Sequence, residues 1–142
     1  MYLWEILLIV AALASLWRRF RGLRRPALFL LAVLVVGPGL GLTVLKDNWG
    51  RARPHQIAEF GGDRQFTPAW VISDQCDKNC SFASGHAAGA FSLMALAWVF
   101  PRQRRFWLIA GAAWGAHMGL MRMAQGGHFL SDVVFSGFIV YF

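Results

Sequence analysis

The chain has 142 residues, of which 57% are hydrophobic and 15% are charged, and its mean hydropathy is +0.47. It is too apolar for a soluble domain of this length and too short for two domains, so the sequence predicts one membrane domain over residues 1–142. The net charge of +7 does not indicate a nucleic-acid partner, because the basic residues are concentrated in short connections between apolar runs.

These apolar runs predict an all-α integral membrane bundle of about five spanning helices. In chain order they cover residues 2–17, 27–45, 84–100, 106–121 and 128–142. The three central runs are nearly uncharged and about as long as a spanning helix. The first run contains Glu5 and the last contains Asp132, and neither is longer than 16 residues.

Basic residues predict the orientation of this bundle. Eight arginines lie in two short connections: Arg18, Arg19, Arg21, Arg24, Arg25, Arg102, Arg104 and Arg105. An excess of this kind marks the cytoplasmic side. Residues 46–83 carry five basic and five acidic side chains, so this neutral, aromatic-rich segment is predicted to be one long outer loop resting on the bilayer surface. The N-terminus is then expected outside.

The outer loop contains Cys76 and Cys80, the two cysteines of the chain. An oxidising compartment would allow a disulfide across this short turn, and two unpaired thiols are the alternative; the sequence leaves both open. A zinc site is disfavoured because it would need a ligand such as His86. No metal is predicted.

Three polar segments lie where apolar runs meet the outer side, at residues 46–54, 83–86 and 122–132. Lys46, Arg53 and Arg122 would bring three cations to one pocket at the membrane surface. Phosphate is the natural ligand of such a group, since an Arg fork binds two of its oxygens and a Lys acts as a point charge.

The same segments supply groups for chemistry on a phosphate. Ser84 and Gly85 stand at the start of an apolar helix, where free N–H groups favour an anion, and His86 follows at its edge. His128 and Asp132 are four residues apart, so on a helix the carboxylate could accept the Nδ1–H and leave Nε2 as a nucleophile. A histidine and an aspartate that merely satisfy each other remain the structural alternative.

Together the segments resemble the signature of the type 2 phosphatidic acid phosphatase superfamily: Lys, six residues, Arg-Pro; then Pro-Ser-Gly-His; then Ser-Arg, five residues, His, three residues, Asp. The matching residues are Lys46, Arg53, Pro54, Ser84, Gly85, His86, Arg122, His128 and Asp132. Ala83 and Met121 depart from the family's Pro and Ser. The resemblance covers residues 46–142, and the family's six-helix bundle implies that this chain is one helix short at its N-terminus.

The resemblance implies a metal-independent and cofactor-free phosphatase. His128 would attack phosphorus, Asp132 would orient it, and His86 would act as general acid and then as base. Phosphate would be held by the remaining matching groups, which are Lys46, Arg53, Ser84, Gly85 and Arg122. The implied substrate is a monoester or diphosphate of a membrane lipid. The implied location is the bacterial inner (cytoplasmic) membrane, with the site facing the periplasm or exterior.

The lipid itself is left open by the sequence. A weaker similarity of the outer loop points to bacterial members that act on lipid A phosphates, while undecaprenyl diphosphate, phosphatidylglycerol phosphate and phosphatidic acid remain candidates. The competing hypothesis is a catalytically silent membrane subunit, or an interaction element of a larger complex. The missing helix and the two departures favour that alternative, whereas the intact His86, His128 and Asp132 favour an enzyme.

Three other polar residues are predicted to have no catalytic role. Arg51 and His55 are expected to be solvated loop residues beside the first segment. His117 lies in the middle of an apolar run and is expected to be a buried, hydrogen-bonded histidine.

Overall fold

The computed structural model describes residues 6, 9–10 and 22–142. In this part the chain forms four helical rods, as the all-α prediction required. The first rod comprises α2 (Arg24–Leu34), the π-helix η2 (Val35–Gly41) and α3 (Leu42–Asn48), and the second comprises α4 (Gly85–Phe91), the 3-10 helix η5 (Ser92–Ala95) and α5 (Leu96–Val99). The others are α6 (Arg104–Ala124) and α7 (Leu130–Tyr141), with 3-10 turns at η3 (Pro54–Gln56), η4 (Ala58–Phe60) and η6 (Pro101–Gln103).

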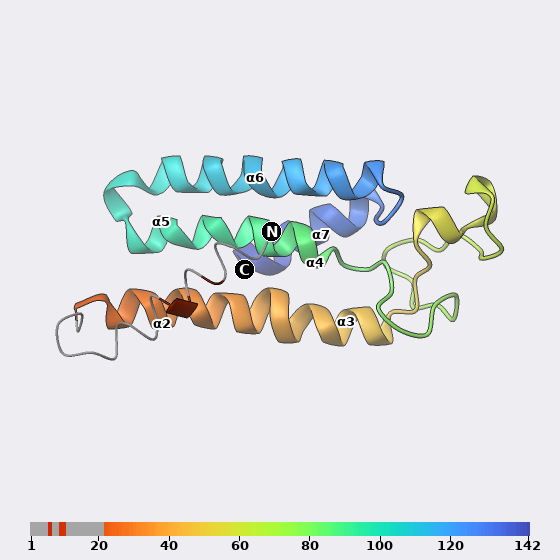
Figure 1. Ribbon diagram of the computed structural model, residues 1–142, viewed down its shortest axis with the longest axis horizontal. Coiled ribbons are helices and arrows are strands. Elements are labelled where there is room, and N and C mark those ends of the chain that lie inside the picture. Colours follow the sequence, from red (N-terminus) through yellow and green to blue (C-terminus); the bar gives the residue numbers. More distant parts are fainter. Residues whose placement is uncertain (1–5, 7–8, 11–21) are drawn as a thin grey trace.

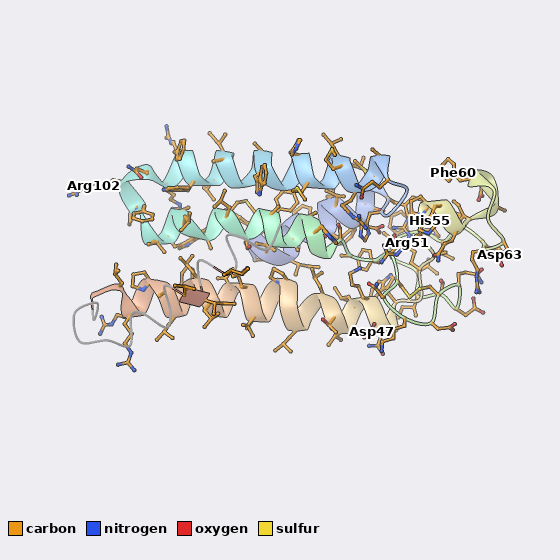
Figure 2. All side chains as sticks on the ribbon, viewed as in Figure 1. Asp47, Arg51, His55, Phe60, Asp63 and Arg102 are labelled. Atoms are coloured by element: carbon orange, nitrogen blue, oxygen red, sulfur yellow. A yellow bond between two sulfur atoms is a disulfide. The ribbon has the colours of Figure 1, made fainter. Side chains whose placement is uncertain are left out.

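The rods run along the long axis of the molecule, with the second rod between α6 and the first rod (Figure 1). α7 packs against α4 and α6. The long loop between α3 and α4 extends beyond one end of the rods, while the turn that contains Arg102 lies at the opposite end (Figure 2). This arrangement brings the ends of α3 and α6 and the beginnings of α4 and α7 to the same end of the bundle.

Close packing of α6 depends on three buried glycines spaced by one helical turn, Gly111, Gly115 and Gly119. A Cβ at Gly111 would lie 2.5 Å from the backbone nitrogen of Met94, and one at Gly115 would lie 2.0 Å from the Phe91 ring. Any side chain on this face would therefore push α6 away from α4 and η5.

The Gly-Pro-Gly sequence in the second apolar run, at residues 37–39, disfavours a regular α-helix. The structure accommodates it as a π-helix of seven residues that contains Pro38. Proline lacks the N–H that an α-helical ladder needs, and a widened turn is one way to absorb that loss. Thr43 satisfies one carbonyl of this stretch, since its hydroxyl donates to Gly39 O at 2.7 Å.

Helix lengths support the expectation of about five spanning helices only in part. Among the described residues only the rod Arg24–Asn48 is both long and apolar enough to cross a membrane, and Gly85–Val99 and Leu130–Tyr141 are shorter apolar helices. The 12 residues of α7 rise by only about 18 Å, against about 30 Å for a bilayer core. Most of the first predicted run, 2–17, lies outside the described residues.

His117 is not buried, and the prediction for it was wrong. Its side chain is exposed on α6 and stacks on Trp114, with ring centroids 5.7 Å apart. The reason is that α6 buries its glycine face and leaves the opposite face uncovered.

Gly111→Ala is expected to lower the midpoint of thermal unfolding in detergent, because overpacking of this kind costs about 1–3 kcal/mol. Gly37→Ala is the matched control, since a Cβ there meets no atom within 4 Å. Equal midpoints for the two variants would contradict the packing described for α6.

Candidate active site

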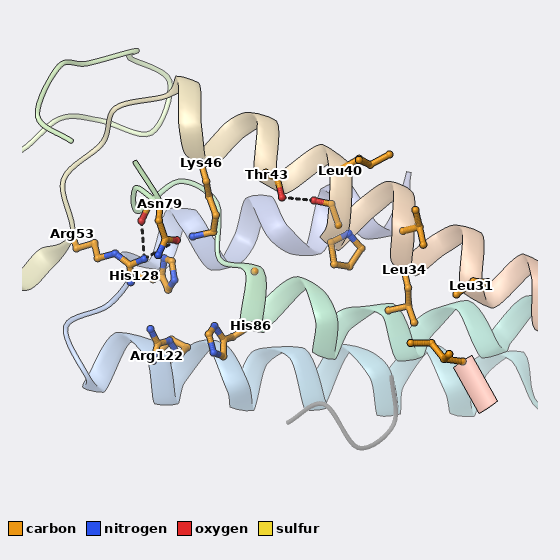
Figure 3. Close-up of a pocket in the computed structure, with 15 residues that line it drawn as sticks. Leu31, Leu34, Leu40, Thr43, Lys46, Arg53, Asn79, His86, Arg122 and His128 are labelled. Atoms are coloured by element: carbon orange, nitrogen blue, oxygen red, sulfur yellow. Dashed lines mark hydrogen bonds between the residues drawn. The ribbon is translucent and has the colours of Figure 1, made fainter. Parts of the chain in front are cut away.

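A cavity of about 680 Å³ opens at the loop end of the rods, where the three polar segments meet (Figure 3). Six of the eight residues predicted for catalysis and phosphate binding line it: Lys46, Arg53, Gly85, His86, Arg122 and His128. Ser84 and Asp132 are fully buried and do not line it. The other wall is apolar and comes from α2 and η2, with Leu31, Leu34, Val35, Pro38 and Leu40. One cavity therefore joins a cationic end to a hydrocarbon-like wall.

Two of the cations are fixed by the same short piece of the outer loop. Lys46, in the last turn of α3, donates from Nζ to the carbonyl of Cys80 at 3.0 Å. Arg53 donates from Nη2 to the carbonyl of Asn79 at 2.8 Å and to its Oδ1 at 3.2 Å. These neutral acceptors orient the two side chains without cancelling their charge.

Arg122 is supplied by the last turn of α6. Its Nη1 donates to Gln125 Oε1 at 2.5 Å, while its Nε is buried and has no hydrogen-bond partner among the described residues. Burial, and after it the charge of Arg122, lower the pKa of the Arg53 guanidinium, as expected for two cations held close together. Between residues 22 and 142 no carboxylate forms an ion pair with Lys46, Arg53 or Arg122. The pocket is therefore electropositive and suited to an anion.

The beginning of α4 lies where the sequence predicted it. Ser84 is the N-cap, and its side-chain oxygen accepts from Ala87 N at 3.4 Å. The Ser84 hydroxyl is thus occupied in capping and is buried behind the pocket, whereas Gly85 lines it. A Cβ at Gly85 would lie 3.7 Å from the Lys46 side chain.

His128 lies in the short connection between α6 and α7 and is almost fully buried. Its Nδ1 lies 2.8 Å from the carbonyl oxygen of Ser81 and 3.7 Å from Asp132 Oδ2. A carbonyl can only accept, so Nδ1 carries the proton and Nε2 of the neutral ring is free of it. Burial lowers the pKa of His128, and the nearby Asp132 carboxylate opposes this shift only in part. The ring is consequently neutral near pH 7.

The main acceptor of the His128 Nδ1–H thus differs from the sequence prediction, which assigned it to Asp132. The Asp132 carboxylate is turned toward the start of α7, where Oδ2 accepts from Phe129 N at 2.8 Å and from Ser81 Oγ at 2.5 Å. Its Oδ1 pairs with Arg51. Spacing along a helix could not reveal these competing donors.

Arg51 is not solvated, and that prediction was wrong. Its side chain is 2% exposed, and its guanidinium lies over the Phe129 ring, 4.2 Å from the centroid. Besides the Asp132 pair, it donates to Thr67 O at 2.8 Å and to Ser131 Oγ at 2.9 Å. The sequence did carry a signal, because a buried aspartate requires a counter-charge.

The outer loop contributes residues that the sequence prediction missed, Asn79 and Ser81. Cys76 and Cys80 form a disulfide around the turn that contains Asn79. His55 is exposed, as expected, and its Nδ1 bonds to Gly126 O at 2.8 Å.

In the part of the chain that the structure describes, no group of three or more His, Cys, Asp or Glu side chains could hold a metal ion.

Residues 26–142 match the PAP2 superfamily. The chain belongs to this superfamily. This membership confirms the resemblance found in the three motifs. Six of the residues that match those motifs line the cavity.

Relatives within the superfamily act on lipid A, according to their names. The chain is 46% identical over 142 residues to a lipid A 4'-phosphatase of Francisella tularensis subsp. novicida (strain U112), covering 96% of this chain and 64% of that protein. It is 42% identical over 106 residues to a lipid A 4'-phosphatase of Rhizobium leguminosarum, covering 73% of this chain and 46% of that protein. A lipid A 1-phosphatase of Rhizobium etli is 40% identical over 106 residues, covering 73% of this chain and 41% of that protein.

The chain therefore spans less than two thirds of the length of each of these relatives. No solved structure matches it.

Lys46→Met and Arg53→Met are each expected to weaken the binding of inorganic phosphate or vanadate by about tenfold or more, because a hydrogen bond to a charged group contributes about 1.5–3 kcal/mol. Titration calorimetry in detergent measures the change. Lys78→Met is the control, since Lys78 is an exposed lysine of the same loop. Equal affinities in all three variants would contradict the assignment of the pocket as a phosphate site.

Proposed function

We propose that this protein is a membrane lipid phosphatase that hydrolyses a lipid phosphate through a phosphohistidine intermediate. The observation that carries the proposal is the cavity itself, which joins an electropositive end to an apolar wall formed by α2 and η2. A lipid phosphate has the same two-part chemistry. Its phosphate matches Lys46, Arg53 and Arg122, and its acyl chains match the apolar wall.

In the first step, the Nε2 lone pair of His128 attacks phosphorus as the bond from phosphorus to the lipid oxygen breaks. His86, which lines the same cavity, gives a proton to the departing oxygen, so that the dephosphorylated lipid leaves as an alcohol. The three cations hold the non-bridging oxygens as the geometry at phosphorus inverts.

In the second step, water attacks the phosphorus of phosphohistidine and the N–P bond breaks. His86, now unprotonated, accepts a proton from this water, and inorganic phosphate and neutral His128 are released. Apart from the attacking water, every group that this cycle uses is a side chain of the protein, so the cycle needs no metal ion or cofactor.

Lipid A is the proposed substrate, and removal of its 4'-phosphate is the proposed reaction. The relatives with the highest identities given above carry the name lipid A 4'-phosphatase, which supports this choice. The identity to a lipid A 1-phosphatase makes the 1-phosphate the second candidate.

We further propose that the rods lie across the bacterial inner membrane, in about five crossings when the undescribed segment is included. The basic turn at Arg102 and the outer loop lie at opposite ends of the rods (Figure 2), which supports a cytoplasmic turn and a periplasmic pocket.

A silent subunit is less well supported than an enzyme. Of the two departures from the family signature, Met121 is 48% exposed and Ala83 is fully buried, and neither lines the pocket. The pocket lining is therefore unaffected by them.

Purified protein in detergent is expected to release phosphate from lipid A in the presence of EDTA, and mass spectrometry of the lipid identifies the position that was cleaved. His128→Ala should lower kcat by at least about a thousandfold, since it removes the nucleophile. His117→Ala is the matched control, because His117 is exposed on α6.

Loss of activity in EDTA with recovery on addition of a divalent ion would contradict the metal-free mechanism. Substantial turnover by His128→Ala would contradict the nucleophile. Negligible release by the wild type from every lipid phosphate tried would favour the silent subunit.

A further inference from the structure

Two cations of the pocket are oriented by a turn that no step of the proposed cycle uses. This disulfide turn comprises residues 76–80 and is closed by the Cys76–Cys80 disulfide. Arg53 donates from Nη2 to two oxygens of Asn79, the backbone carbonyl at 2.8 Å and Oδ1 at 3.2 Å (Figure 3). Lys46 donates from Nζ to the carbonyl of Cys80 at 3.0 Å. Two consecutive residues of the turn thus supply acceptors to two different cations.

The neutrality of these acceptors suits a phosphate site. Asn79 lines the cavity beside Lys46 and Arg53, and its amide fixes the direction of the guanidinium without adding charge. Both cations keep further N–H groups for a ligand, because a guanidinium and an ammonium each have several donors. A carboxylate at the same place would instead compete with phosphate for Arg53 and would repel the phosphate itself.

The disulfide turn is anchored on one side and exposed on the other. Cys80 is fully buried, and its N–H donates to Lys46 O at 3.1 Å. Asn79 N donates to Asp47 Oδ1 at 3.2 Å, whereas the side chains of Asp77 and Lys78 are exposed. The disulfide is the covalent link between the exposed part of the turn and its buried end.

The backbone of Asn79 needs such a constraint. Its φ is 52°, in the left-handed region, where residues other than glycine are uncommon and asparagine is enriched. A turn without its cross-link has more conformations available, and in most of them the oxygens of Asn79 would not face Arg53. The orientation of Arg53 therefore depends on the closed turn.

We infer that the disulfide turn is a positioning element of the phosphate site, in which Asn79 orients Arg53, Cys80 orients Lys46, and the disulfide holds both acceptors in place. The inference rests on the proposed function, because it takes these cations as the phosphate ligands. It assigns a role to three residues outside the family signature. In the proposed periplasmic location the compartment is oxidising, so the site gains its full affinity for phosphate once the disulfide has formed.

The role of Asn79 is tested by two substitutions of opposite character. Asn79→Asp keeps the shape of the side chain but adds a negative charge, and it should weaken the binding of inorganic phosphate about tenfold. Asn79→Ala removes one acceptor of Arg53 and leaves the carbonyl, so a loss of about threefold is expected. Titration calorimetry of the purified protein in detergent measures both. A purely structural role predicts the reverse order, because aspartate matches the shape of asparagine and tolerates the left-handed region better than alanine does.

Gln65→Glu is the matched control for the added charge. Gln65 is an exposed residue of the same outer loop and does not line the cavity. Its change from amide to carboxylate should leave the phosphate affinity within about twofold of the wild type. Midpoints of thermal unfolding, measured for all variants, identify any that lose affinity through unfolding.

Reduction tests the disulfide itself. A dithiol such as dithiothreitol gives the disulfide two electrons and two protons, which yields two thiols while the dithiol becomes a cyclic disulfide. The reduced wild type is expected to bind inorganic phosphate about threefold or more weakly. Mass spectrometry after alkylation of the denatured protein verifies the reduction. Cys76→Ala combined with Cys80→Ala should show the same weak binding with and without the dithiol, which controls for other effects of the reductant.

The outcomes separate this inference from the proposed function. An oxidised wild type that neither binds inorganic phosphate nor releases it from any lipid would contradict the phosphatase itself. Normal wild-type binding, with Asn79→Asp unchanged or less affected than Asn79→Ala, would overturn the role of Asn79. Equal phosphate affinities of the oxidised and fully reduced wild type would overturn the role of the disulfide. If reduction unfolds the protein, the comparison of the two Asn79 variants decides the inference.

Discussion

The arrangement of the pocket depends on the burial of one carboxylate. Asp132 is completely inaccessible, and a carboxylate in that position requires a counter-charge and several donors. Arg51 provides the charge and Ser81 and Phe129 provide donors. These contacts join the segment after α3, the segment before α4 and the start of α7. The carboxylate thus contacts the first and third polar segments directly, and it contacts Ser81, which lies just before the second.

The pocket in front of this buried pair carries the opposite electrostatic character. Its cations are oriented by carbonyl and amide oxygens of Asn79, Cys80 and Gln125, so their charge remains available to an anion. The charges of Arg51 and Asp132 neutralise each other. The pocket cations have no carboxylate partner among the described residues. In the proposed mechanism, this division allows one small region to hold a neutral nucleophile and an anionic substrate at the same time.

Much of the candidate site could be predicted from the sequence because polar residues at the ends of apolar runs have few alternative explanations. Lys46, His86 and His128 were identified on that basis, and all three line the cavity. Arg51 was missed because an arginine in a polar loop is usually solvated, and only the tertiary structure buries it. Helix boundaries were predicted less well, since hydropathy does not show where Ser92–Ala95 tightens to a 3-10 helix or where Leu130 begins α7.

The central claim is that His128 forms a bond to phosphorus, and the most direct test is to trap and map the phosphoenzyme. Enzyme mixed with phosphate-labelled lipid substrate and quenched in base within one turnover should carry label on His128, in an acid-labile and base-stable linkage. Peptide mapping would locate it. Label on a serine in an acid-stable linkage, or full turnover with no label on the protein, would contradict the account.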